Sequence, residues 1–356
     1  MKAMRVHRFG PPESMCWDEV ETPTPAPGEA LVRVRATGVN RADVDMRSGI
    51  YGNVPMEELY LYEGMTFPFT PGIEPVGTVE SIGEGGLGVS GGVSVGDRVI
   101  PHSHLSCGKC RNCLLGFDNA CPQLRILGVQ TGEKGGYAEY FTWPVELLIP
   151  LPDSLGFEAA ASLLVNYGPV WTALVERTNL RPGETVVVTG ASGGCGHAAI
   201  EVGLMLGARV IGLAGSDEKL AELERLGAVP VDYRGGFAAE VMKLTDGAGA
   251  DVILELVGGE NWVETINSAG LRGRIAIVGA HGGMRAPIDL TMISGKSLDI
   301  HGVTRFNHAV SKTLVRMAGE GRLSPRPSQT FTLEHASEAH ALMEERRHSG
   351  KIVLTV

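Results

Sequence analysis

The chain has 356 residues, of which 43% are apolar, and its formal net charge is −10 at pH 7. This length exceeds that of one compact unit and predicts two domains. No apolar stretch approaches the roughly 20 residues of a membrane-spanning helix, and the dispersed Lys and Arg residues form no basic stripe. We therefore expect no membrane and no nucleic-acid partner. The N-terminal segment lacks the apolar centre of a signal peptide, which makes the cytoplasm the expected location.

Short β-strands are predicted for the first third of the chain. Between Ala30 and Arg35, Val32 and Val34 alternate with arginines. This period of two gives a strand one buried and one solvated face, as in an antiparallel sheet. We therefore expect a β-rich first unit.

Four of the six cysteines lie close together, with the spacing C-x2-C-x2-C-x7-C. Clustered cysteines in a cytosolic chain favour metal over disulfides, and four thiolates form a closed tetrahedral shell for Zn²⁺, which is a structural arrangement. Gly108 and Gly116 allow the loop to wrap an ion. The sequence thus predicts one structural zinc ion per chain in the segment 107–121, with disulfides or free thiols as the alternative. Its ligands are Cys107, Cys110, Cys113 and Cys121.

From about residue 180 onward, predicted strands alternate with predicted helices. The helices cover Ile200–Gly207, Leu220–Leu226, Ala238–Leu244 and Trp262–Ser268. Six strands with helical or looped crossovers predict an α/β fold with a doubly wound parallel sheet. A final helix, Ala336–Arg346, and a final strand, Lys351–Val356, are expected to rejoin the first unit. The six strands are Val186–Val188, Val210–Leu213, Val229–Tyr233, Val252–Val257, Ile275–Val278 and Leu298–Gly302.

A glycine-rich turn joins the first of these strands to its helix. Glycines permit positive φ and close approach of a pyrophosphate, and a helix N-terminus offers unpaired N–H groups. In this strand-turn-helix context the turn predicts a dinucleotide site, whereas a merely tight turn is the alternative. The residues expected to contact the cofactor are Gly190, Ser192, Gly193, Gly194, Cys195 and Gly196.

The end of the next strand favours NADPH over NADH. An NAD site places Asp or Glu there to bind the ribose 2′-OH, but this chain has Ala214 at that place. Small residues, a hydroxyl and cations suit a 2′-phosphate instead. As alternatives, Ser216 caps the following helix, Lys219 is a solvated surface residue, and Asp217 leaves room for NAD. The expected phosphate donors are Ser216 and Lys219, with Tyr233 and Arg234 from the next strand.

Several motifs in order make the chain resemble the medium-chain dehydrogenase/reductases, close to their quinone oxidoreductase branch. The resemblance covers essentially the whole chain. It implies a GroES-like substrate domain over 1–165 and 306–356, a Rossmann NADP-binding domain over 166–305, an active site in the cleft between them, and homodimers or homotetramers. The motifs are Thr37–Asp43, Pro71–Glu74, Val95–Val99, Gly190–Gly196 and Gly350–Val353.

The catalytic zinc of the family's alcohol dehydrogenases lacks its ligands here. Asn40 stands where the first Cys would be, Ile73 where the His would be, and Val165 or Asn166 in the region of the third ligand. None of these side chains binds zinc well. Two histidines before the cysteine cluster remain as alternative ligands: His102 and His104.

Without a Lewis acid, hydrogen bonds alone must stabilise the developing oxyanion. This favours hydride transfer to a small-molecule substrate in which charge is spread, namely an enone, 2-alkenal, enoyl thioester or quinone. The resemblance implies the same reaction classes. Two alternatives remain open: a zinc-dependent alcohol dehydrogenase with atypical ligands, and a non-catalytic NADPH-binding protein.

The resemblance also implies roles for individual residues. Tyr51 is the leading candidate to bind the substrate carbonyl and a candidate proton donor, with Tyr167 as a weaker candidate and an ordinary loop aromatic as the alternative. Asn40 is expected beside the nicotinamide, and Asp43 and Glu74 at inner carboxylate positions. The segment 51–69 is longer than usual and is a candidate lid or pocket wall. Further cofactor contacts are expected from Val257, Gly279 and Ala280 near the nicotinamide and from Lys351 at the pyrophosphate.

Overall fold

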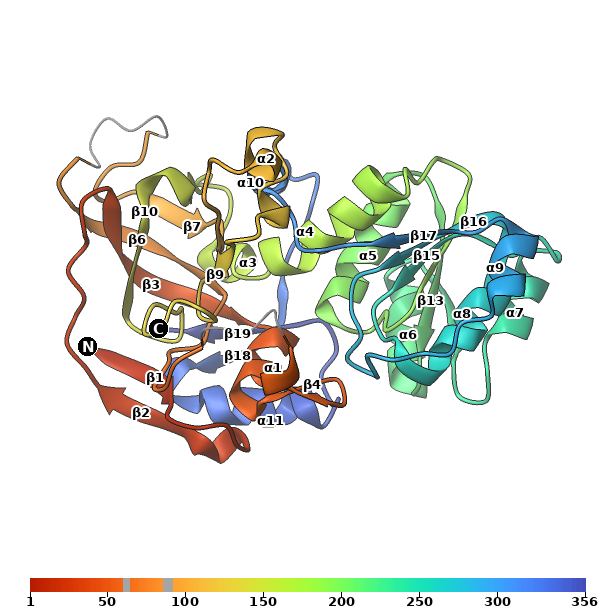
Figure 1. Cartoon of the computed structure of the whole chain (residues 1–356), viewed down its shortest axis with the longest axis horizontal. Helices are drawn as coiled ribbons and strands as arrows, with labels where there is room; N and C mark the ends of the chain where they lie inside the picture. Colours follow the sequence, from red (N-terminus) through yellow and green to blue (C-terminus); the bar gives the residue numbers. More distant parts are fainter. Residues whose placement is uncertain (60–64, 86–91) are drawn as a thin grey trace. The chain divides into compact units, whose positions relative to one another are not determined.

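The computed structural model describes residues 1–59, 65–85 and 92–356. The chain divides into two compact units, one formed by Met1–Val165 with Asn307–Val356 and the other by Asn166–Phe306. In the first unit the two ends of the chain lie side by side, because β3 (Glu29–Val39) pairs with β19 (Lys351–Thr355) (Figure 1). Among the described residues, no helix combines the length and the apolar character that crossing a membrane requires.

A seven-stranded sheet runs through the first unit in the order β11-β7-β6-β3-β19-β18. The strand β10 pairs with the beginning of β3, and β19 pairs with its end. Val32 and Val34 are buried and Arg33 and Arg35 are exposed, which confirms the predicted alternation. The other strands are β6 (Glu74–Ile82), β7 (Arg98–Pro101), β10 (Tyr140–Pro144), β11 (Leu148–Pro150) and β18 (Pro327–Thr332).

Smaller elements complete the first unit. Three two-stranded pairs are β1 (Lys2–Val6) with β2 (Met15–Glu19), β4 (Ile50–Tyr51) with β5 (Val54–Pro55), and β8 (His104–Leu105) with β9 (Arg125–Ile126). The predicted C-terminal helix ends early because Arg346 has a positive φ of 55°. The helices are α1 (Arg41–Ser48), α2 (Arg111–Leu114), α3 (Phe157–Ala160), α10 (His308–Gly319) and α11 (Ala336–Glu344).

The second unit contains the predicted six-stranded parallel sheet, in the order β14-β13-β12-β15-β16-β17. The fold-class prediction is therefore confirmed. One strand ends two residues earlier than predicted, because the backbone N–H groups of Val257 and Gly258 donate to the Glu255 side chain instead of continuing the ladder. The strands are β12 (Thr185–Val188), β13 (Arg209–Ala214), β14 (Val229–Asp232), β15 (Ala250–Glu255), β16 (Ala269–Ile277) and β17 (Asp299–Gly302).

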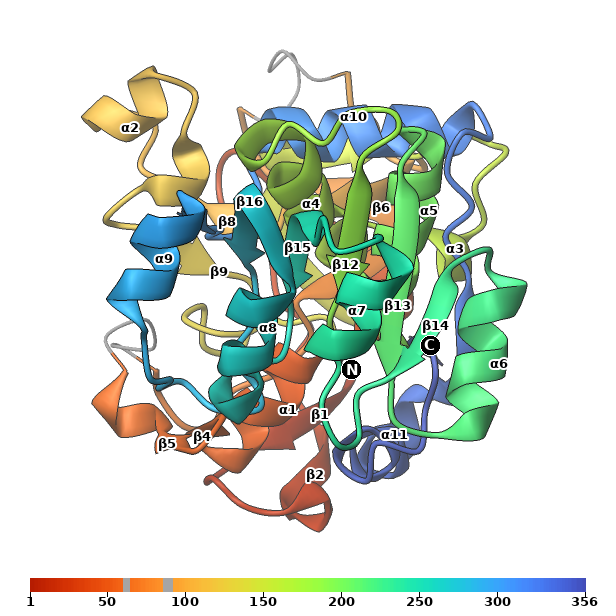
Figure 2. The same cartoon turned by 90° about the vertical axis from the view of Figure 1, so that its right-hand side faces the viewer.

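Helices cover both faces of this sheet. Val187 packs in a cluster with Val241 and Ile266 from two helices that lie in front of the strands in Figure 2, whereas Val186 lies toward Gly203 on the opposite face. Adjacent residues of one strand thus meet different layers. The helices are α4 (Leu164–Trp171), which spans the boundary between the units, α5 (Gly194–Met205), α6 (Asp217–Arg225), α7 (Ala238–Leu244), α8 (Trp262–Ser268) and α9 (Leu290–Lys296).

Candidate functional site

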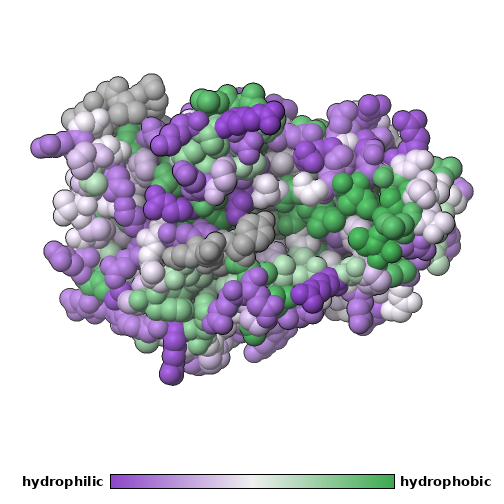
Figure 3. All heavy atoms as spheres, viewed as in Figure 1, coloured by the Kyte–Doolittle hydropathy of each residue, from purple (hydrophilic) through white to green (hydrophobic). Residues whose placement is uncertain are grey.

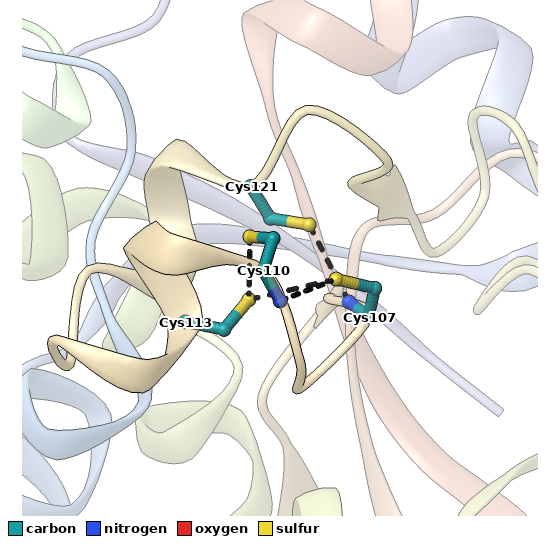
Figure 4. A group of neighbouring side chains, drawn as sticks. All are labelled: Cys107, Cys110, Cys113 and Cys121. Carbon is teal, nitrogen blue, oxygen red and sulfur yellow. Dashed lines mark hydrogen bonds between the residues drawn. The ribbon is translucent and has the colours of Figure 1, made fainter.

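The four clustered cysteines converge on one point (Figure 4). Their sulfur atoms all lie within 4.8 Å of one another, although the four residues come from a loop whose helices are only α2 and the 3-10 turn Asp118–Ala120. Backbone N–H groups donate to sulfur: that of Cys110 to Cys107 Sγ over 3.3 Å, and that of Gln123 to Cys121 Sγ over 3.4 Å. Such donors stabilise thiolate charge, and the set of four thiols fits a tetrahedral Zn²⁺ ion.

Residues 107–121 form the cysteine lobe, and the thiols of Cys107 and Cys113 in it differ in pKa when no metal is bound. Backbone hydrogen bonds lower the pKa of Cys107 to about 6. Desolvation and a hydrogen bond from Cys110 raise the pKa of Cys113 to about 11. Because metal ligation requires thiolates, binding of an ion to this loop would release protons.

The lobe is tied to the body of the first unit through Asp118. Its carboxylate oxygens accept the backbone N–H of His308 at 3.2 and 3.4 Å and lie 3.3 Å from Nε2 of His102. His102 is fully buried, and its Nδ1 lies 2.8 Å from the hydroxyl of Ser311 in α10. This histidine, one of the two alternative zinc ligands of the sequence analysis, therefore supports the cysteine lobe.

A buried ion pair occupies the region where the sequence lacks metal ligands. Lys351 Nζ donates to Glu74 Oε2 over 2.6 Å and also to the side-chain oxygen of Asn40. The second oxygen of Glu74 accepts the backbone N–H of Val165 over 2.8 Å. Lys351 is 4% exposed, Glu74 2% and Asn40 6%. Glycine is required beside this pair, because a Cβ at Gly38 would lie 2.6 Å from Glu74 Oε2.

Asp43 holds the backbone around this ion pair. Its carboxylate accepts the N–H groups of Asn40, Gly72 and Ile73 over 2.9, 3.1 and 3.2 Å, and with Asn40 it forms the capping box of α1. Burial raises the pKa of Asp43 to about 6 although these donors and Lys351 oppose the shift. Burial likewise raises the pKa of Glu74.

The residues here do not fit a catalytic zinc ion. Asn40 and Ile73 offer no thiolate or imidazole. The carboxylate of Glu74 is already engaged by Lys351 and by the backbone. The ammonium group of Lys351, which the resemblance places at the cofactor pyrophosphate, is thus engaged within the first unit by Glu74 and Asn40.

Tyr51 lies in β4, directly after α1, and packs partly buried against the core of the first unit. Asn40 begins the same helix. The structure thus places Asn40, Asp43, Lys351 and Tyr51 in one unit. Residues 60–64 of the candidate lid 51–69 lie outside the described residues. Tyr167 belongs to the second unit, where its hydroxyl donates to Glu201 over 2.5 Å.

The glycine-rich turn has the backbone that a dinucleotide site requires. Gly190 follows β12 with φ 60°, and Gly193 is the N-cap of α5. A Cβ at Gly196 would lie 2.2 Å from the carbonyl oxygen of Ala191, so no larger residue fits there. Val257 and Ala280 lie beside glycines of this edge: a Cβ at Gly190 would lie 3.1 Å from a Val257 methyl group, and one at Gly258 would lie 3.3 Å from the Ala280 methyl group.

The expected 2′-phosphate residues gather at the ends of β13 and β14. The Ser216 hydroxyl caps α6 and accepts the backbone N–H of Lys219 over 3.4 Å, as in the capping alternative. The Tyr233 hydroxyl lies beside Gly215, whose added Cβ would be 2.6 Å away. The half-exposed guanidinium of Arg234 pairs with Asp232 at 2.6 Å and lies 3.5 Å from Asp217.

Sequence reasoning missed a buried carboxylate at the cofactor end of the sheet. Glu255 is fully buried and accepts hydrogen bonds from Thr189, Thr265 and the backbone N–H groups of Val257 and Gly258, all between 2.6 and 2.9 Å. It therefore fixes the ends of β12 and β15. In the sequence, this carboxylate could have been found as an acidic residue at the end of an apolar strand.

Comparisons with known proteins agree with this arrangement. The model of the alcohol dehydrogenase GroES-like domain matches residues 26–153, and that of the zinc-binding dehydrogenases matches residues 194–320. The quinone oxidoreductase of Sus scrofa is 30% identical over 99% of this chain and 97% of its own length.

Solved structures are similar over the whole length of this chain. One named as an NAD-dependent alcohol dehydrogenase has a TM-score of 0.91 with 35% identity, and a mycobacterial protein complexed with NADPH has a TM-score of 0.82 with 26% identity; both comparisons cover 100% of each chain. The chain therefore belongs to the medium-chain dehydrogenase/reductase superfamily, in its quinone oxidoreductase branch.

Proposed function

We propose that this oxidoreductase reduces a conjugated carbonyl compound or a quinone with NADPH, without a catalytic zinc ion. The observation that carries the proposal is the buried Lys351–Glu74 pair with Asn40. These side chains place an ammonium group, its carboxylate partner and an amide group among the residues that match the family's metal region. Relatives named as quinone oxidoreductases support the proposed acceptor class.

Hydrogen bonding suffices for such substrates, because the negative charge that develops on hydride addition is spread over the conjugated system. When bound, NADPH supplies a hydride. As the new C–H bond forms at the far carbon of an enone, the C=C electron pair moves toward the carbonyl oxygen. Lys351 and Asn40 would stabilise the resulting enolate electrostatically, and a proton donor completes the reduction. For a quinone, the negative charge forms on a carbonyl oxygen of the quinone.

We assign the proton-donor role to Tyr51. Its place directly after α1, the helix that Asn40 begins, supports this assignment. For Tyr51→Phe, turnover is expected to fall by about 10²–10⁴-fold, the usual contribution of a positioned acid, with NADPH affinity near that of the wild type. Tyr140→Phe, a tyrosine of β10, is the matched control. Unchanged turnover in Tyr51→Phe would remove this residue from the mechanism.

We assign NADPH as the preferred cofactor. The supporting observations are Ala214 at the end of β13 and the cationic side chain of Arg234 nearby. Arg234→Gln is expected to weaken NADPH binding by roughly 10- to 150-fold, since a hydrogen bond to a charged group contributes ~1.5–3 kcal/mol, and to leave NADH binding unchanged. Arg225→Gln, an exposed arginine of α6, is the control. An equal loss of affinity for NADPH and NADH would argue against a contact between Arg234 and the 2′-phosphate.

A zinc-dependent alcohol dehydrogenase with atypical ligands is the second candidate. The similarity to a structure named as an NAD-dependent alcohol dehydrogenase favours it. In that case Glu74 would have to leave Lys351 and bind metal.

One substrate panel distinguishes the candidates. Enones, 2-alkenals, quinones, enoyl thioesters and alcohols are assayed with NADPH and NADH, and bound zinc is measured in parallel. We expect NADPH-dependent reduction of a conjugated acceptor, with the tightly held zinc confined to the cysteine lobe. Alcohol oxidation that a chelator abolishes would favour the second candidate. Cofactor binding with no turnover would indicate a non-catalytic NADPH-binding protein.

A further inference from the structure

Three metal-binding side chains gather on the β1–β2 ribbon, away from the cysteine lobe in sequence. Cys16 and Asp18 are alternate residues of β2, so both side chains point to the same face of the ribbon. The ladder pairs Arg5 with Cys16, and His7 lies two residues after Arg5 along the chain. The side chains of these three residues bring an imidazole, a thiol and a carboxylate together.

The three ligand atoms are close enough to share one ion. One donor atom from each residue lies within 4.8 Å of the others, and His7 Nε2 is 2.6 Å from Asp18 Oδ2. Ligand atoms around a tetrahedral zinc ion are about 3.3–3.6 Å apart, as follows from its usual bond lengths. Shifts of about 1 Å in exposed side chains would reach this spacing. The side chain of His7 is 47% exposed and that of Asp18 26%, so both an ion and water have access.

The surrounding charges can balance a divalent cation. Arg5 lies 3.6 Å from Asp18 Oδ2, but its guanidinium also binds Glu133. Asp18, Glu133 and Arg5 together carry one negative charge, and the Cys16 thiolate would make it two. Arg5 faces Cys16 across the ladder, so its guanidinium lies on the same face of the ribbon as Asp18.

We propose that His7, Cys16 and Asp18 form a second metal site, which binds Zn²⁺ with water as the fourth ligand. The ion would replace the contact between His7 and Asp18, and binding would release the proton of the Cys16 thiol. Mixed nitrogen, sulfur and oxygen ligands suit zinc better than calcium or magnesium. Because the site is exposed and has only three protein ligands, it would exchange metal faster than the four-cysteine lobe.

The test is a metal titration that is independent of enzyme activity. Protein whose cysteine lobe has been loaded with zinc is dialysed to remove weakly bound ions and then titrated with Co²⁺, whose thiolate charge-transfer absorption reports sulfur ligation. The wild type is expected to bind one further ion per chain with that absorption. Cys16→Ala should lose the absorption, and His7→Ala and Asp18→Asn should weaken binding at least about 10-fold, because even residues that only support a ligand contribute that much.

His335→Ala removes another exposed histidine near a carboxylate and should bind the further ion like the wild type. Zinc retained in the lobe and an unchanged circular dichroism spectrum verify that each variant is folded. No further ion in the wild type, or undiminished binding in both Cys16→Ala and His7→Ala, would overturn the proposal. Such results would leave the proposed reductase function untouched, because neither side chain takes part in it.

Discussion

Lys351 brings a positive charge into the interior of the first unit, where it needs partners. Taking an ammonium and a carboxylate out of water costs several kcal/mol per ion, which mutual attraction offsets only with good geometry and further hydrogen bonds. Glu74 meets both conditions, because one of its oxygens binds Lys351 and the other the backbone N–H of Val165. The pair thereby joins β19, β6 and, through Asn40, the start of α1.

We predict that Lys351→Met destabilises the protein by about 3–5 kcal/mol, because Glu74 would remain buried without its cation. Urea unfolding followed by tryptophan fluorescence measures the loss. The double variant Lys351→Met/Glu74→Gln should recover part of it, since the uncompensated charge is gone. A loss below about 1 kcal/mol in the single variant would show that water compensates the charge.

Asp43 should make stability depend on pH. Its folded-state pKa of about 6 lies above the ordinary value of 3.8, so the folded state favours the protonated form. This contribution to stability is complete below about pH 3.8 and is lost as the pH rises through 6. The wild type is therefore expected to lose stability relative to Asp43→Asn between pH 4 and pH 6, as measured by urea unfolding at each pH. The exposed Asp153→Asn should show no such trend; a flat difference for Asp43→Asn would contradict the prediction.

At the level of elements, the cysteine lobe depends on local sequence for its ligands and on distant sequence for its attachment. The spacing of the cysteines places four sulfurs together within one loop. Asp118, in the same loop, then binds the backbone of His308 at the start of α10. A metal ion in the lobe would thus stabilise the contact between the loop and a helix far along the chain.

We predict that removal of zinc from the lobe loosens this segment locally. Without an ion the four cysteines lose the bonds that hold them together, and a structural zinc ion in small peptides contributes roughly 10–16 kcal/mol. After chelation, limited proteolysis is expected to cut between residues 107 and 121, while NADPH binding persists. Added Zn²⁺ should restore resistance. Equal resistance to proteolysis with and without zinc would show that the structure of this loop does not depend on metal.

The helix α1 shows why some elements escape sequence patterns. Arg47 is 1% exposed because its guanidinium binds the carbonyl of Gly10 and the carboxylate of Glu344. Asp43 and Asp45 of the same helix are buried too. A helix that buries charged side chains has no continuous apolar stripe, so its sequence periodicity does not predict a helix. The α7 and α8 bounds, by contrast, agree with the sequence prediction, because these helices bury apolar faces.

On the scale of the whole molecule, the second unit presents a surface suited to self-association. β17 is an edge strand of the six-stranded sheet, and Figure 3 shows apolar side chains gathered over the region of α9 and β17. Ile288, Leu290 and Ile300 are 58%, 74% and 36% exposed. Edge strands and exposed apolar patches of this kind mark association sites, and we propose that the protein forms homodimers or homotetramers through this surface.

The double variant Leu290→Asp/Ile300→Asp is expected to lower the mass in solution, because buried charges at an apolar interface cost more than the contacts contribute. Light scattering after size-exclusion chromatography measures this mass. Val95→Asp, at an exposed residue of the first unit, is the control. A wild type that is monomeric at micromolar concentration would contradict the proposed assembly.

The sequence by itself determined the features that depend on short spacing: the cysteine cluster, the glycine-rich turn and the alternation of strands with helices in the second unit. Each rests on neighbours within one loop or on one repeating period. Only the tertiary structure decided which distant groups meet, such as the Lys351 ammonium with Glu74 or the backbone N–H of His308 with Asp118. The pairing of β3 with both β6 and β19 sets the first contact, and the packing of the cysteine loop against α10 sets the second; no local pattern encodes either.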